Sequence, residues 1–179
     1  MDPEQQREWS DLRQRAEAEL RRGSPPAQRG VRVARVAQVL VMPAFANWVA
    51  SEVYKVTDAG AEQFVATRSM WDQVADAACF ANPLERLRHP QPMAPTLVHV
   101  SHALPQPDAS QLARDVAALA VQLAPQAHHL GLDGTTYVLT VGDSFAEVSI
   151  RWWQSPPSNW TNVARLADRV VALVDAAVG

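Results

Sequence analysis

The residue types that most often perform chemistry in proteins are sparse in this chain. It has one cysteine, Cys79, and five histidines, which are His89, His99, His102, His128 and His129. His99 and His102 lie in a segment that alternates like a β-strand, so they point to opposite faces and cannot easily share a metal ion. A lone cysteine is more often a small buried hydrophobic residue than a nucleophile. We therefore expect no metal site and no cofactor.

The adjacent pair His128 and His129 is the best candidate for an acid–base or metal site. The pair precedes Asp133 in a loop, where it could meet Asp133 or Asp143 at the end of the hairpin that follows. Such a site would suit a hydrolase, with the proline-rich loop 82–95 as a further wall. Because no spacing signature supports metal ligation, we favour two solvated loop imidazoles.

The local motifs of the large enzyme classes are absent from the sequence. With only 7 glycines, the chain contains neither the phosphate-binding loop nor the dinucleotide-binding spacing. It also lacks the G-x-S-x-G elbow of hydrolases, the H-E-x-x-H zinc motif and the kinase signatures. The sequence therefore argues against an enzyme but does not exclude one.

Composition narrows the class of protein further. The 179 residues are 47% hydrophobic and 20% charged, as in an ordinary globular protein with one core. The net charge of −3 is spread along the chain and indicates no nucleic-acid partner. A single cysteine excludes an internal disulfide, and no run is long and apolar enough for a secretory signal or a membrane span. We expect a cytoplasmic protein that contacts neither nucleic acid nor membrane.

The segment Ala146–Trp153 indicates a surface that binds another protein. In a strand, Glu147, Ser149, Arg151 and Trp153 share one face, opposite the apolar face that contains Trp152. An exposed tryptophan beside an arginine is typical of an interaction hot spot. Those four residues are therefore our candidate binding surface.

Large aromatic residues on a sheet are more often structural, and Trp153 has such an alternative. It could pack under an N-terminal helix or under the proline-rich loop. Trp160 could also close over the end of the strand.

Hydrophobic periodicity predicts the elements that position these residues. Helices are expected at 3–22, 71–78, 108–123 and 163–178, and strands at 31–41, 48–56, 63–70, 96–104, 135–141 and 146–153. Asp72 and Asp108 are the expected N-caps of the second and third helices. Gly142 supplies the positive φ that a tight hairpin between the last two strands needs.

The order of these elements predicts an α+β fold. Strands joined mainly by hairpins, with helices to cover them, indicate a two-layer sandwich. Its largely antiparallel sheet would have about six strands, covered by three to four helices. We expect one domain over residues 1–179, with the helix 3–22 and the loop 23–30 as a peripheral element.

The C-terminal third carries a pattern that resembles a known group of proteins. The pattern comprises Asp133-Gly134-Thr135, Tyr137, Arg151-Trp152-Trp153, Pro156-Pro157 and Trp160, followed by the helix from Val163 to Val174. It is similar to the C-terminal part of small uncharacterised bacterial proteins, some of which resemble immunity proteins that neutralise a toxin by binding it. These are turn and core residues, so the resemblance implies a fold more than an activity, and it carries over no catalytic residue.

Together these observations predict a cytoplasmic bacterial protein that binds another protein, as an immunity or inhibitor module does, and that is not an enzyme. Two alternatives stay open. One is a hydrolase with a site at His128, His129 and Asp133. The other is a small-ligand-binding domain, which an apolar pocket with a few convergent polar groups would favour. The sequence determines neither the partner nor the oligomeric state.

Overall fold

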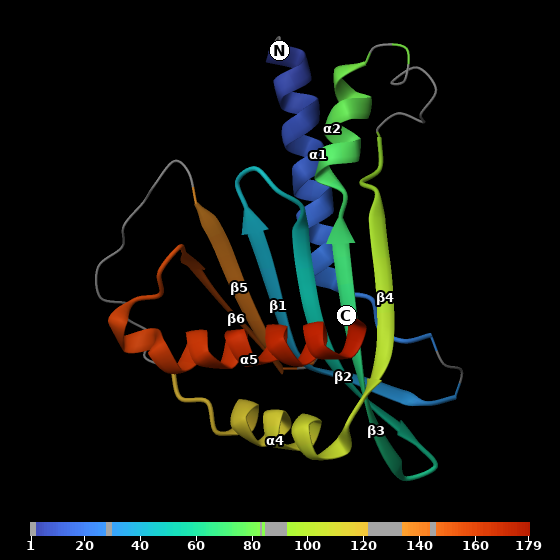
Figure 1. Ribbon diagram of the computed structural model, residues 1–179, viewed down its shortest axis with the longest axis vertical. Coiled ribbons are helices and arrows are strands. Elements are labelled where there is room, and N and C mark those ends of the chain that lie inside the picture. Colours follow the sequence, from blue (N-terminus) through green and yellow to red (C-terminus); the bar gives the residue numbers. More distant parts are fainter. Residues whose placement is uncertain (1–2, 28–29, 83, 85–92, 122–133, 144–145) are drawn as a thin grey trace.

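The computed structural model describes residues 3–27, 30–82, 84, 93–121, 134–143 and 146–179 (Figure 1). Along the chain the elements are α1 (Pro3–Arg22), β1 (Arg32–Pro43), β2 (Trp48–Asp58), β3 (Ala61–Trp71), α2 (Gln73–Ala81), β4 (Leu97–Leu104), α4 (Gln106–Ala117), β5 (Thr135–Asp143), β6 (Ala146–Trp153), the 3-10 turn η1 (Ser158–Trp160) and α5 (Thr161–Val178). This is the order of helices and strands that the periodicity predicts.

The strands form one antiparallel sheet of 6 strands in the order β4-β3-β2-β1-β5-β6. Three pairs are sequential hairpins, and β5 joins the sheet by pairing with β1 from Ala37↔Val141 to Pro43↔Thr135. The predicted α+β class, with a largely antiparallel sheet of about six strands and three to four helices, is confirmed.

One face of the sheet packs against α4 and α5, and α5 crosses the strands (Figure 1). Alternate strand residues such as Val39, Val53 and Leu139 point to this face. The apolar stripe of α5 meets them with Val170 and Val174, which are both fully buried. This is the larger of the two hydrophobic clusters.

The α1 helix runs lengthwise along the strands and packs on the opposite face (Figure 1). Its narrow stripe of Leu12, Ala16 and Leu20 is almost completely buried, against a cluster that includes Leu40 and Trp71. Helices therefore cover part of both faces of the sheet, and the rest of the α1 side carries polar and aromatic residues. The helix expected at the periphery is an integral part of the fold.

Two helix starts illustrate where local rules hold and where they fail. Asp72 caps α2 as predicted, because its side chain accepts a hydrogen bond from the backbone N–H of Ala75. Asp108 does not cap α4, which begins at Gln106 after Pro105 and places Asp108 in its first turn. The fixed φ of proline already suits a helix start, so the helix begins earlier than the polar pattern predicts. α4 also ends at Ala117, short of the predicted Leu123.

Gly142 has the predicted positive φ, +96°, but it lies within β5, where it pairs with Glu147, and not in the turn itself. A Cβ there would lie 1.9 Å from the carbonyl oxygen of Ala146. Only glycine therefore fits this position near the end of the strand.

Candidate binding groove

The predicted binding residues of β6 all lie on the α1 side of the sheet. Ser149 and Arg151 pair in register with Thr140 and Val138 of β5, and alternation brings Glu147 and Trp153 to the same face. Trp152 points the other way into the larger cluster, where it stacks on Tyr137 with ring centroids 5.5 Å apart. The face assignment of this strand is therefore correct.

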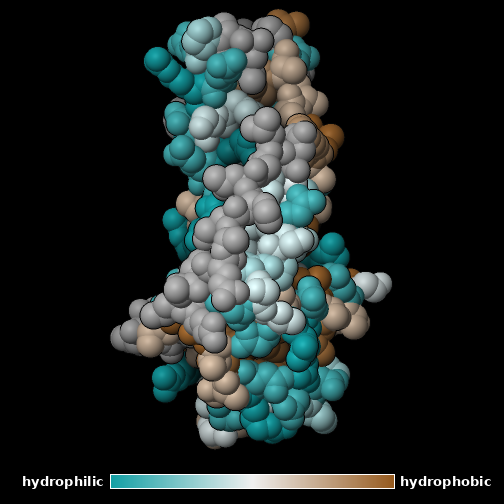
Figure 2. All heavy atoms as spheres, turned by 90° about the vertical axis from the view of Figure 1, so that its left-hand side faces the viewer, coloured by the Kyte–Doolittle hydropathy of each residue, from teal (hydrophilic) through white to brown (hydrophobic). Residues whose placement is uncertain are grey.

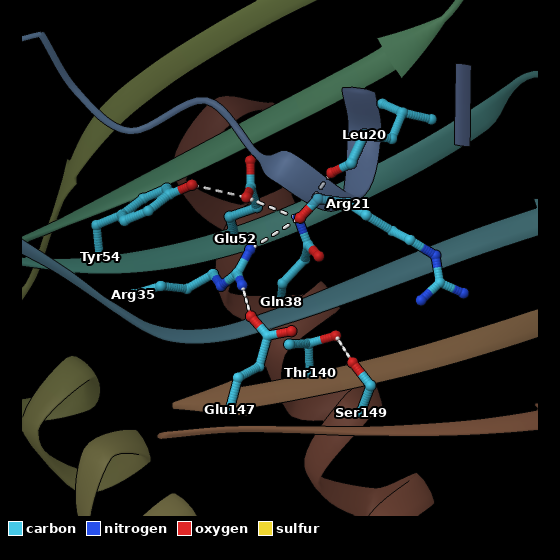
Figure 3. Close-up of polar contacts among 9 residues, drawn as sticks. All are labelled: Leu20, Arg21, Arg35, Gln38, Glu52, Tyr54, Thr140, Glu147 and Ser149. Atoms are coloured by element: carbon cyan, nitrogen blue, oxygen red, sulfur yellow. Dashed lines mark hydrogen bonds and ion pairs between the residues drawn. The ribbon is translucent and has the colours of Figure 1, made fainter. Parts of the chain in front are cut away.

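Internal contacts divide the four residues into two pairs. Glu147 forms an ion pair with Arg35, and the Ser149 hydroxyl is 2.7 Å from the Thr140 hydroxyl, so both are engaged within the sheet (Figure 3). Arg151 keeps 56% of its side chain exposed, and Trp153 is half-buried. Arg151 and Trp153 are the members that face a cavity.

That cavity is a groove of about 630 Å³ between the N-terminal half of α1 and the adjoining ends of β1, β2, β5 and β6. Its aromatic lining residues are Trp9, Phe45, Trp48 and Trp153, and its charged ones are Arg13, Glu17 and Arg151. Gln6, Ser10, Gln14 and Thr136 add polar groups. Figure 2 looks onto the β5–β6 side of the molecule, where hydrophilic atoms predominate and hydrophobic ones lie along one margin and among the hydrophilic atoms of the lower third.

Packing holds the aromatic floor of the groove rigid. The Trp48 indole donates to the backbone oxygen of Pro43 at 3.2 Å and meets Trp71 edge-on at 4.9 Å. Trp9 of α1 contacts Trp71 at 5.8 Å and Phe80 of α2 at 5.5 Å. These contacts fix α1 against the sheet, so the groove is preformed.

Phe45 stands apart from this packed floor. It lies in the β1–β2 turn at the groove and is 83% exposed. An aromatic side chain left in water loses the free energy that its burial would contribute, about 2 kcal/mol or more. It is the most exposed large hydrophobic residue among those the structure describes.

The charges of the groove are unbalanced towards the positive. The Arg13 guanidinium lies 5.1 Å from the centre of the Trp48 ring, and no carboxylate of the described residues forms an ion pair with it. Glu17 is held at 2.8 Å by Arg21 of the same helix, and Arg151 approaches the same Glu17 oxygen at 3.3 Å. One carboxylate thus serves two arginines, and Arg151 has donors to spare.

Gly134 allows the Trp153 ring to lie over the start of β5. A Cβ on Gly134 would be 2.6 Å from a carbon of the indole, closer than such atoms approach. The Gly134 carbonyl also accepts from the N–H of Ala44, which ties β5 to the β1–β2 turn. The glycine of the D-G-T motif therefore has a steric role at the groove.

The structure bears on the alternatives in which another element covers Trp153. Trp153 lies across the groove from residues of α1, and it is only half-buried, less than a core tryptophan would be. Trp160 is buried in the cluster on the other face of the sheet, so it does not cover Trp153. Packing under the loop 82–95 concerns residues that lie largely outside the described part of the chain.

The histidine site also lies outside it, since His128, His129, Asp133 and His89 all fall in residues that the structure does not describe. His99 and His102 do point to opposite faces, because they pair with Ser69 and Ala66 on strand β3. Cys79 is half-buried and packs against the α1 cluster. Within the described ranges, no cluster of three or more His, Cys, Asp or Glu residues could hold a metal ion.

A buried polar network anchors the C-terminal end of α1 (Figure 3). Glu52 of β2 is completely buried, and its oxygens accept from the Gln38 amide at 2.8 Å, the Tyr54 hydroxyl at 2.7 Å and the N–H of Ser24 at 3.1 Å. Gln38 also donates to the carbonyl of Leu20 at 2.8 Å, which ties the last turn of α1 to the sheet. The network satisfies helix-end groups that burial would otherwise leave unpaired.

Burial dominates the electrostatics of this network. Desolvation raises the pKa of Glu52 above 4.5, against the lowering effect of its hydrogen bonds and of the nearby Arg35. The pKa of Tyr54 is also raised, by burial first and then by the adjacent carboxylate. Gly23 leaves room for both groups, since a Cβ there would lie 2.1 Å from a Glu52 oxygen. The network supports one end of the helix that forms a wall of the groove.

Comparison with known proteins found no family model, curated protein or solved structure that matches this chain. The likeness of its C-terminal residues to immunity-like bacterial proteins therefore stays a prediction. Among the helices in the described residues, none combines the length and the apolar character that crossing a membrane requires.

Several groove residues are not identifiable from local sequence. Trp9 and Arg13 belong to a charged amphipathic helix, and Trp48 begins a strand far along the chain, so only the packing of α1 brings them to β6. Phe45 gave a usable signal, because it is a large aromatic in the short turn between Pro43 and Trp48, where exposure is expected.

Proposed function

We propose that this protein is a non-enzymatic module that binds another protein through the groove between α1 and β6, in the manner of an immunity or inhibitor protein. One observation carries the proposal: Phe45, Trp153, Arg13 and Arg151 converge from three separate elements on a single preformed groove. Aromatic residues and arginine are the types most enriched in binding hot spots.

The charges indicate the chemistry of the partner. Arg13 and Arg151 are on opposite walls, and Glu17 neutralises Arg151 only through a single contact of 3.3 Å. A partner carboxylate would replace that long contact with a shorter charge-assisted bond and would leave Glu17 to Arg21. An apolar side chain beside it would cover Phe45. The groove thus fits a partner segment that presents an acidic residue next to a large apolar one.

The cysteine content favours one location for the complex. We place the protein in the bacterial cytoplasm, because its one cysteine suits a reducing compartment. We expect the partner to be a protein of the same compartment, and neither nucleic acid nor a membrane.

The proposal is tested by capture of proteins from a lysate of the native host on purified protein. Phe45→Ala and the double variant Arg151→Ala/Trp153→Ala should lose a stoichiometric partner. Val74→Ala and Arg22→Ala should keep it, since these residues are comparably exposed on α2 and α1 but lie outside the groove. Retention of the same partner by both groove variants would exclude this surface.

A small-ligand-binding domain is the second candidate, and the groove volume favours it. About 630 Å³ falls within the range of roughly 300–1,000 Å³ typical of ligand sites. Empty capture lanes, together with a thermal shift of wild-type protein by an anionic aromatic compound that is absent in Arg151→Ala, would favour this candidate. No observation on the described residues favours the hydrolase alternative.

A further inference from the structure

β4 forms one edge of the sheet, and the outer side of this strand is exposed and regular. β4 is the last strand in the sheet order, and it pairs with β3 from Leu97↔Trp71 to Leu104↔Phe64 without a bulge. Within the part of the chain that the structure describes, no strand pairs with its other side. A row of N–H and C=O groups on that side is thus available for pairing.

The composition of β4 lacks the features that usually prevent edge pairing. The strand Leu-Val-His-Val-Ser-His-Ala-Leu contains no lysine, arginine, aspartate, glutamate or proline. The opposite edge strand, β6, carries Glu147 and Arg151 within the same length. Charged residues on an edge oppose the approach of another strand. The two edges of this sheet therefore differ, and β4 is the unprotected one.

The faces of β4 are exposed as well as its edge. Val98 and Val100, on the same side of the sheet as α5, are 46% and 41% exposed, although valine is usually buried. On the other side the His99 ring is held by the hydroxyls of Ser24 and Ser69, both at 2.8 Å. These contacts keep the strand ordered for pairing.

We infer that β4 is a self-association edge, where the β4 strands of two copies pair antiparallel about a twofold axis. A second copy fits for two reasons. The strand is complementary to itself, because it carries no charge and its exposed valines, Val98 and Val100, would lie beside those of the other copy. Twofold pairing also covers both exposed edges at once, so the assembly closes as a dimer.

The geometry of sheets restricts the register of this pairing. Directly opposed residues must lie on the same side of the continuous sheet, so the axis passes through a residue and not between two. The two residues at the centre of β4, Val100 and Ser101, give the longest pairing. Centred on Val100, the two valines face each other, with Val98 opposite His102 of the second copy. In either register the exposed valines of both chains form one apolar stripe beside the α5 helices.

The dimer has a consequence that rests on the proposed function. A twofold axis perpendicular to the sheet puts the α1 sides of both copies on the same face. The two grooves then open on one side of the assembly, which would allow a partner with two epitopes to bind with higher avidity.

Sedimentation and light scattering of the full chain test the inference. Wild-type protein should show twice the mass of the 19.6 kDa chain and dissociate on dilution. Val100→Lys should be monomeric at the same concentration. Val148→Lys, at a 54% exposed valine on β6, is the matched control and should stay dimeric. A monomeric wild type at high concentration, or a dimer lost only in Val148→Lys, would overturn the inference.

Cross-linking gives a second measurement that does not depend on the lysine variant folding. In a Cys79→Ala background, Val100→Cys or Ser101→Cys should form an intermolecular disulfide, because opposed Cα atoms in an antiparallel pair are about 4.5–5.5 Å apart. Val148→Cys should not. A dimer in which neither β4 cysteine cross-links would place the interface elsewhere. Capture by the groove is measured separately, so a monomer would leave the proposed function standing.

Discussion

Replacing Glu52 with glutamine should change how stability depends on pH. Glu52 is fully buried and its pKa is raised chiefly by desolvation, so the folded protein holds the proton at pH values where the unfolded chain has released it. The unfolded state then binds fewer protons than the folded state, and the free energy of unfolding falls as pH rises. Glutamine cannot ionise, so the free energy of unfolding of Glu52→Gln should lack this decrease with rising pH.

The size of this pH dependence corresponds to the binding of one proton. The window begins near pH 4.5 and ends at the raised pKa of Glu52. Within it, the difference in the free energy of unfolding between Glu52→Gln and wild type should grow by up to about 1.4 kcal/mol per pH unit. Above that window the difference is constant. The amide of the new glutamine also faces the Ser24 N–H, which leaves a donor unpaired and costs roughly 1–3 kcal/mol. That cost does not depend on pH, so only the slope tests the argument.

Urea unfolding followed by tryptophan fluorescence measures both quantities. Curves for wild type and Glu52→Gln would be recorded from pH 4.5 to 8, with the m-value checked for constancy. Glu62→Gln is the control, because this carboxylate is 47% exposed and pairs with Lys55 at the surface. A pH-independent difference between wild type and Glu52→Gln would refute the assignment of a raised pKa to Glu52.

Three further changes have defined outcomes. Leu12→Ala should lower the free energy of unfolding by about 2–5 kcal/mol, as measured by urea denaturation, because Leu12 is 1% exposed between α1 and the sheet. Gly142→Ala should destabilise the protein or shift the β5–β6 hairpin, since the φ of +96° and the contact with Ala146 both exclude a methyl group; an unchanged Tm would contradict this. Phe45→Ala should leave the Tm within about 1 °C, because Phe45 is 83% exposed, and should weaken partner binding about thirty-fold, the effect of a 2 kcal/mol hot spot in a titration.

Local patterns predict most of the architecture of this protein. The alternation of β6, the stripe of α5 and the glycine at position 142 each specify a structure by steric or hydrophobic rules that act over a few residues. The same rules correctly place Arg151 and Trp153 on one face of β6. They misplace the start of α4, where the backbone restriction of Pro105 outweighs the capping preference of Asp108.

The polar network and the groove are decided by tertiary structure. Glu52 and Gln38 are ordinary strand residues in the sequence, and their burial follows only from the docking of α1 over β1 and β2. The groove likewise requires α1 to lie beside β6, although these elements are separated by most of the chain. The sequence by itself determined the elements and their faces, because those depend on period and turn chemistry. Which faces meet was decided by long-range packing, because a hydrophobic stripe specifies burial but not its partner.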